Sequence, residues 1–391
     1  MSKTLTARHL VTSNGVIAFP VITLDDAGNI REITSDPKAL AHATDTLTAA
    51  FLDVHSHGGV GVDVMQATPS DLGKLQRFLA QHGVGHYLPT TVTAPIDPTL
   101  RALETLANAI ESTPNDGEAQ PIGIHLEGPF LSHAKRGVHP PPDLQAPSVE
   151  LFDRFQAAAR GHIKLVTIAP EPNAALKPAA DSTAVELIHH ASTQGVRVSI
   201  GHTNATAAET LAAIDAGATS ATHTYNAMRA LDHREPGVLG TVLDDKRLYA
   251  ELICDGVHVA PPLVRLWLKA KTPQRAILVT DSMSAAGMPD GPYKLGLFDV
   301  IVKDGVAWLI EGERTSLAGS LLTLDRAVSN LQRFTGAPLS DATQMASHTP
   351  ATMIGKPEAT RITLGAPANF NRFNANNELI ATYLRGKEIV R

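Results

Sequence analysis

The feature that most constrains this 391-residue chain is one pattern that occurs eight times in succession between Phe51 and Asp281. Each repeat is a short apolar run, rich in β-branched residues, that ends at a polar residue and precedes a segment with helical hydrophobic spacing. Alternating strands and helices predict parallel strands buried on both faces, and eight such units predict an α/β fold with a closed (β/α)8 TIM-like barrel. The predicted strands are Phe51–His57, Gly85–Thr91, Ile122–Glu127, Ile163–Ala169, Val196–His202, Ala218–His223, Leu248–Cys254 and Ala276–Asp281.

The two ends of the chain follow a different pattern. Residues 4–50 alternate strand-like stretches with turn signals such as Asn14-Gly15, and residues 368–391 do the same around Leu379–Leu384. These ends predict one small β-sandwich domain, formed by residues 1–50 plus 356–391, beside a barrel formed by residues 51–355. A further hairpin is expected around Asp304-Gly305, within the barrel segment.

Composition limits the partners of this protein. Its 33 lysines and arginines against 39 aspartates and glutamates give a net charge of −6 without any block of like charge, which argues against nucleic acid and membrane as partners. No run approaches the about 18 apolar residues of a membrane span, and no secretory signal pattern opens the chain. The single cysteine, Cys254, excludes an internal disulfide and a multi-cysteine zinc site. We therefore expect a soluble cytoplasmic protein.

Polar side chains gather where the predicted barrel strands end. His55 and His57 are two residues apart on one strand and so face the same side. Such a pair arises easily by chance among 17 histidines, but four further runs also end at an ionisable residue, namely Glu127, His202, His223 and Asp281. These positions share the carboxyl rim of the barrel, where functional residues of such folds lie. The alternative, satisfied polar residues beside loops, is disfavoured because burying histidine or glutamate without a partner is costly.

This set of side chains favours metal-dependent hydrolysis. Neutral imidazoles with a carboxylate suit a borderline divalent ion such as zinc or iron. Such an ion makes water acidic enough to attack at neutral pH and polarises a carbonyl oxygen. Asp281 is then the expected general base and acid, which takes a proton from water and delivers it to a leaving nitrogen.

Eight strings along the chain carry a more specific signal. They are HSHGG (55–59), HLEGPF (125–130), GHTNAT (201–206), ATHTYNAM (221–228), REPG (234–237), CDGVHV (254–259), LVTDSMSAAG (278–287) and LAGS (317–320). Together they resemble, in order over residues 50–355, the N-acetylglucosamine-6-phosphate deacetylases of the amidohydrolase superfamily. The resemblance implies hydrolysis of the N-acetyl group of N-acetylglucosamine 6-phosphate, with glucosamine 6-phosphate and acetate as products.

The resemblance also implies roles for individual residues. Glu127, His202 and His223 would bind the metal ion common to the family, and His55 with His57 would hold a second ion. We therefore expect two divalent ions per chain, zinc or iron, with Asp281 as the catalytic residue. His125 is expected to orient Glu127 or the attacking water. The residues implied for substrate binding are His139, Asn226, Ala227, Arg234 and His258. Arg234 would reach the sugar phosphate of a neighbouring subunit, which implies a homodimer.

Two alternatives remain at this point. The first is a related amidohydrolase that acts on N-acetylgalactosamine 6-phosphate or another amide, since no motif reports on the single hydroxyl that distinguishes the two epimers. The second is a barrel without catalysis that serves as a metal-binding scaffold. The second alternative predicts damage to the ligand set or to Asp281, and the sequence has none.

Overall fold

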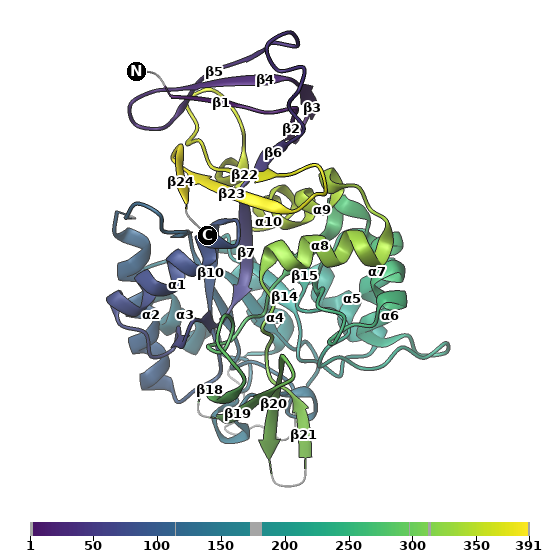
Figure 1. Ribbon diagram of the computed structural model, residues 1–391. Helices are drawn as coiled ribbons and strands as arrows, with labels where there is room; N and C mark the ends of the chain where they lie inside the picture. Colours follow the sequence, from purple (N-terminus) through teal and green to yellow (C-terminus); the bar gives the residue numbers. More distant parts are fainter. Residues whose placement is uncertain (1–2, 114, 173–181, 297, 312–313, 390–391) are drawn as a thin grey trace.

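The computed structural model describes residues 3–113, 115–172, 182–296, 298–311 and 314–389. Figure 1 shows a barrel surrounded by helices, with a strand-rich layer at one end and a small sheet at the other. Within the described part of the chain, none of the helices is both long and apolar enough to cross a membrane.

Eight parallel strands form the barrel, as the sequence predicts. Their order is that of the chain, and each strand pairs with the next one in parallel register, from β7 to β17. Every strand lies within two residues of its predicted bounds. The strands are β7 (Phe51–Ser56), β10 (Val84–Thr91), β12 (Ile124–Glu127), β13 (Ile163–Ile168), β14 (Arg197–Ile200), β15 (Ala218–Ala221), β16 (Tyr249–Ile253) and β17 (Ala276–Val279).

The seam between β17 and β7 leaves the barrel nearly closed. A ladder joins the other neighbouring strands, but in the described residues this seam is held by single contacts. The backbone N–H of Asp281 donates to the carbonyl of His55 at 2.8 Å, and the hydroxyl of Thr280 donates to the buried carboxylate of Asp53 at 2.6 Å. The seam therefore brings the predicted HxH pair beside the predicted catalytic aspartate.

Helices cover the outside of the barrel because their apolar faces pack against the strands. Three of them begin with a capping box, in which Thr68, Thr183 or Thr206 and an acidic residue three positions later satisfy the first free N–H groups. The helices are α1 (Pro69–Gln81), α2 (Ile96–Glu111), α3 (Val149–Ala158), α4 (Ala184–Thr193), α5 (Ala207–Ala216), α6 (Gly237–Asp244), α7 (Pro261–Arg275), α8 (Leu324–Thr335), α9 (Leu339–Ala346) and α10 (His348–Met353).

Strands from both chain ends form two further sheets, which confirms the predicted sandwich. One sheet contains β1 (Thr4–Thr6), β4 (Pro20–Leu24) and β5 (Ile30–Ser35). The other has the order β24 (Lys387–Ile389), β23 (Leu379–Leu384), β22 (Phe370–Phe373), β6 (Thr46–Ala49), β2 (His9–Thr12) and β3 (Gly15–Ala18). Their shared core is one cluster that includes Leu10, Ile22, Leu47 and Phe370. We propose that 1–50 with 356–391 is a single domain; its outermost residues, 1–2 and 390–391, lie outside the described residues.

A four-stranded sheet lies at the carboxyl ends of the barrel strands. It contains the predicted hairpin, β19 (Phe298–Lys303) and β20 (Val306–Glu311), and two flanking strands that the sequence did not predict, β18 (Gly291–Leu295) and β21 (Arg314–Leu317). In Figure 1, β7 runs from the β-sandwich toward this sheet. Short elements complete the fold, namely β8 (Gly58–Gly59), β9 (Val62–Asp63), β11 (Gln120–Pro121) and the 3-10 helices at His133–Lys135, Pro141–Asp143 and Pro357–Thr360.

Candidate active site

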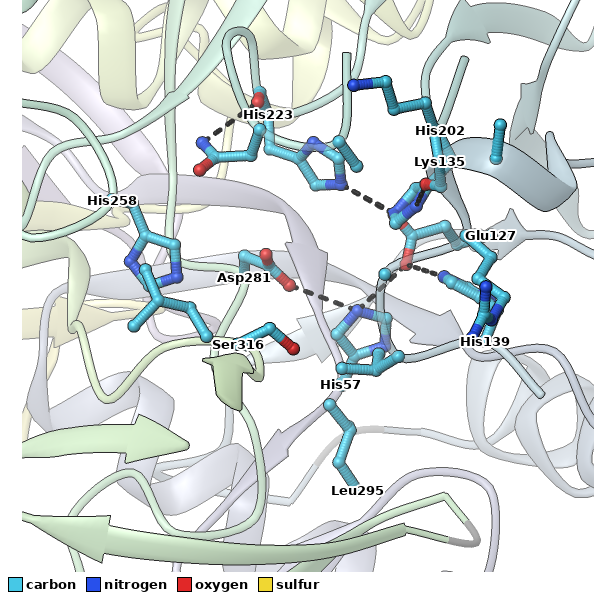
Figure 2. Close-up of a pocket in the computed structure, with 18 residues that line it drawn as sticks. His57, Glu127, Lys135, His139, His202, His223, His258, Asp281, Leu295 and Ser316 are labelled. Atoms are coloured by element: carbon cyan, nitrogen blue, oxygen red, sulfur yellow. Dashed lines mark hydrogen bonds and ion pairs between the residues drawn. The ribbon is translucent and has the colours of Figure 1, made fainter. Parts of the chain in front are cut away.

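The five predicted metal ligands converge at the carboxyl rim of the barrel. Glu127 lies at their centre: its Oε1 is 3.3 Å from the Nε2 atoms of His202 and His223, and its Oε2 is 3.2 Å from Nε2 of His57. His55 Nε2 lies 3.5 Å from Glu127 Oε1. The donors form two groups that share Glu127, one with His55 and His57 and one with His202 and His223. Figure 2 shows His57, Glu127, His202 and His223 pointing toward one another.

The backbone bends sharply to present three of the site residues. His202, His223 and Asp281 each lie two residues beyond the end of their strand and have left-handed φ angles of 47°, 28° and 49°. Such angles cost a non-glycine residue about 1–3 kcal/mol, and they persist where the surrounding structure enforces them. The strain turns each side chain from the strand direction toward the centre of the rim.

In three of the four histidines, a hydrogen-bond partner at the outer ring nitrogen fixes how the inner nitrogen is protonated. Nδ1 of His57 donates to the carbonyl of Thr90 and Nδ1 of His202 to the carbonyl of Lys135, both at 3.0 Å. Nδ1 of His55 lies 3.1 Å from Oε2 of Glu251. A carbonyl oxygen only accepts, so these contacts hold the proton on Nδ1 and leave the Nε2 lone pair facing the site.

This arrangement of acceptors fits a divalent cation. The Nε2 atoms of His55 and His57 are 3.3 Å apart and those of His202 and His223 are 3.0 Å apart. Among the residues that the structure describes, none donates a hydrogen bond to Glu127 Oε1. Lone pairs held this close repel one another unless positive charge lies between them. Burial opposes protonation of His57, but the neighbouring carboxylates of Asp281 and Glu127 outweigh it and raise the pKa of His57 to about 9. The surroundings of this ring therefore stabilise a positive charge. Imidazole and carboxylate donors suit zinc or iron.

Asp281 joins this set from the seam. Its Oδ1 lies 3.2 Å from Nε2 of His57 and 3.5 Å from Nε2 of His55, and it lines a cavity that also contains His57, Glu127, His202 and His223. Burial alone would raise the pKa of Asp281, but His55 and His57 hold it below its usual range. The site therefore contains an ionised carboxylate that can accept a proton beside the ligand set.

A cavity of about 410 Å³ opens over these residues. This volume suits a small polar ligand. Four of the five residues predicted to bind substrate line it, namely His139, Asn226, Ala227 and His258. The fifth, Arg234, does not line it; it is exposed on the segment between β15 and α6.

Two of the lining histidines differ in character. His139 is buried, its Nδ1 lies 2.7 Å from the hydroxyl of Thr93, and its ring packs edge-on against His202; burial lowers its pKa to about 4. His258 contacts Asp255 Oδ2 through Nδ1 at 2.5 Å, and although burial opposes this, Asp255 raises the pKa of His258. His258 is therefore the one of the two that is suited to an anionic ligand.

The structure also places residues that the sequence did not single out. Glu251 is fully buried in β16 and contacts His55. The sequence feature that could have identified it is a single carboxylate inside an otherwise apolar strand. Lys135 lines the cavity and supports His202 with its carbonyl. His125, expected to orient Glu127 or water, instead lies 2.8 Å from the hydroxyl of Thr167 and packs edge-on against the ring of His55.

Known proteins are similar in sequence to this chain over most of its length. The model of the amidohydrolase family matches residues 46–389. The chain is 39% identical to an N-acetylgalactosamine-6-phosphate deacetylase of Escherichia coli O157:H7, over 91% of this chain and 90% of that protein. It is 35% identical to an N-acetylglucosamine-6-phosphate deacetylase of Bacillus subtilis (strain 168), over 96% of this chain and 94% of that protein.

The fold is shared as well. A mutant N-acetyl-D-glucosamine-6-phosphate deacetylase from Mycobacterium smegmatis, solved in complex with N-acetyl-D-glucosamine-6-phosphate, matches with a TM-score of 0.89 and 32% sequence identity. The match covers 100% of both chains, so it includes the barrel and the sheets at either end.

Proposed function

This chain belongs to the amidohydrolase family, and we propose that it hydrolyses the N-acetyl group of N-acetylglucosamine 6-phosphate to glucosamine 6-phosphate and acetate. The observation that carries the proposal is the meeting of Asp281 with two histidine–glutamate groups at the base of one cavity. A metal-binding scaffold without catalysis would account for the two ligand groups, but not for the ionised carboxylate of Asp281 that lines the cavity beside them.

Amidohydrolases depend on metal, and we propose two ions per chain, zinc or iron. His55, His57 and Glu127 would hold one ion, and Glu127, His202 and His223 the other. When bound, the metal supplies Lewis acidity, which polarises the acetyl carbonyl and makes water a competent nucleophile near neutral pH.

Asp281 carries the proton in the proposed reaction. Its ionised carboxylate takes a proton from the attacking water as the new C–O bond forms at the acetyl carbon. The same carboxyl group then gives the proton to the sugar nitrogen as the C–N bond breaks, so a neutral amine and acetic acid are formed. The acetic acid then loses its proton to solvent and leaves as acetate. Asp281 ends the cycle ionised, as it began.

The rest of the cavity would orient the phosphorylated sugar. We assign His139, Asn226, Ala227 and His258 to this task because they line the cavity around Asp281. Arg234 is exposed and lies outside the cavity of its own chain, so we propose that it binds the phosphate in a partner's site within a homodimer. A phosphorylated sugar substrate also favours a cytoplasmic enzyme.

A second candidate substrate is N-acetylgalactosamine 6-phosphate. A 39% identical relative carries that activity in its name, while the 35% identical relative is named for the gluco epimer. The two sugars differ in the orientation of one hydroxyl. A site that hydrogen-bonds a hydroxyl discriminates strongly against an analogue that leaves its polar groups unpaired.

The proposal is tested by measuring acetate release from both epimers, together with the metal content of the purified protein. We expect the higher kcat/KM with N-acetylglucosamine 6-phosphate and about two metal ions per chain. Chelation should abolish activity, and added zinc should restore it. A higher kcat/KM with the galacto epimer would transfer the proposal to that substrate, and full activity in metal-free protein would refute the mechanism.

A further inference from the structure

Glu251 occupies an unusual position for a carboxylate. It lies in the middle of β16, is 0% exposed, and is flanked in the strand by the buried residues Ala250 and Leu252. Burying a carboxylate in such surroundings is costly unless it is hydrogen-bonded. Its contacts therefore indicate what the residue does.

One oxygen of Glu251 contacts both ligand groups. Oε2 lies 3.1 Å from Nδ1 of His55 and also accepts the backbone N–H of His223 at 3.3 Å. The backbone carbonyl of Glu251 accepts the N–H of Thr224 at 2.8 Å, which holds the segment after β15 against β16. Glu251 thus orients the ring of His55 and fixes the backbone of His223.

Glu251 differs in kind from the groups behind the other ligands. His57 and His202 donate through Nδ1 to neutral backbone carbonyls, those of Thr90 and Lys135. His55 donates to a carboxylate, which holds the Nδ1–H tautomer and makes Nε2 a stronger donor to a metal ion. Side-chain partners of this kind typically change metal affinity by about 10–100-fold when they are removed.

We propose that Glu251 is a positioning residue that sets the metal affinity of the His55–His57–Glu127 group. The proposal deepens the proposed function, because it rests on metal binding by that group. Glu251 holds the lone pair of His55 Nε2 toward the ion, and its charge increases the basicity of the ring. In the described residues, His202 has a backbone carbonyl rather than a carboxylate behind it, and His223 contacts Glu251 only through its backbone N–H. The effect on that group should therefore be smaller.

Two substitutions separate charge from hydrogen bonding. In Glu251→Gln, the amide oxygen can still accept from His55 but the charge is lost, and in Glu251→Leu both are lost. Zinc affinity is measured by competition with a chromophoric chelator on metal-stripped protein. The site formed by His55, His57 and Glu127 is identified as the one that the His57→Ala variant lacks. We expect this site to lose about 10-fold in zinc affinity in the glutamine variant and up to about 100-fold in the leucine variant. The other site should change less than fivefold.

A matched control is Glu118→Gln. Glu118 is also a buried carboxylate, but it binds Arg77 and Asn115 away from the site, so zinc affinity should not change. Circular dichroism and melting of the metal-free proteins test folding, and if the leucine variant does not fold, the glutamine variant decides. Wild-type zinc affinity at both sites of folded Glu251→Gln would overturn the inference. Wild-type protein that binds zinc but releases no acetate would refute the proposed function and leave this inference standing.

Discussion

At the scale of single residues, the proposed reaction depends on Asp281. Its carboxylate lies within 3.2 Å of Nε2 of His57, and the surrounding histidines keep it ionised. Asp281→Asn preserves the shape of the side chain but removes the base. We expect kcat to fall by about 10²–10⁴-fold, with the metal content retained. Steady-state kinetics with metal analysis on the same sample checks this.

The control for this substitution is Asp299→Asn. Asp299 is 86% exposed at the side chain and pairs with Lys294, so its kcat should equal that of the wild type. If Asp281→Asn kept near wild-type kcat, the proton would have to travel through another group, and His258, which also lines the cavity, would be the next to examine.

At the scale of elements, a side chain of α7 caps the C-terminal end of α6. The ammonium group of Lys271 donates to the carbonyls of Val242 and Asp245 at 2.8 and 2.7 Å, where the helix has no further N–H groups to offer. Only 2% of Lys271 is exposed, and burial lowers its pKa to about 8. This contact anchors the far end of the helix that follows Arg234.

The lowered pKa predicts how stability changes with pH. Between pH 8 and 10.5 the unfolded chain holds a proton on Lys271 that the folded chain has released, so this residue adds stability as the pH rises. Lys271→Met lacks this contribution. Urea unfolding of both proteins at pH 8 and pH 10 should therefore show a larger advantage of the wild type at pH 10. An equal or smaller difference at pH 10 would contradict the assignment.

At the scale of the whole molecule, the exposed position of Arg234 predicts a shared site. Arg234→Ala chains are co-expressed with Asp281→Asn chains. If Arg234 acts across a two-fold interface, each mixed dimer has one intact site and one doubly altered site. Random pairing makes about half of the dimers mixed, so activity should recover to about a quarter of wild type.

Two further measurements test the same prediction for Arg234. Arg234→Ala alone should raise KM for the phosphorylated sugar far more than for unphosphorylated N-acetylglucosamine, because it removes a phosphate contact. Verified mixed dimers that recover no activity would show that Arg234 serves its own chain, and a monomer in solution would exclude the shared site altogether.

Local patterns in the sequence determined the barrel and the positions of most of the candidate ligands. The eight strands follow from short apolar runs between helical segments, because hydrophobic periodicity acts between near neighbours in the chain. His202, His223 and Asp281 were recognisable because each is the polar residue that ends such a run, and parallel strands end at one rim. The β-sandwich was predictable from turn signals at both ends of the chain.

Tertiary structure alone decided which groups contact the outer ring nitrogens of those candidate ligands. Glu251 and His55 are 196 residues apart, and the carbonyl of Lys135 supports His202 from a segment 67 residues away. The contact between Asp53 and Thr280 depends on the barrel returning to its first strand, which no local pattern specifies. The tautomers of the histidine rings, and the fit of the site to a cation, follow from these contacts. Such contacts require distances of about 3 Å, which arise only when strands distant in the sequence pack side by side.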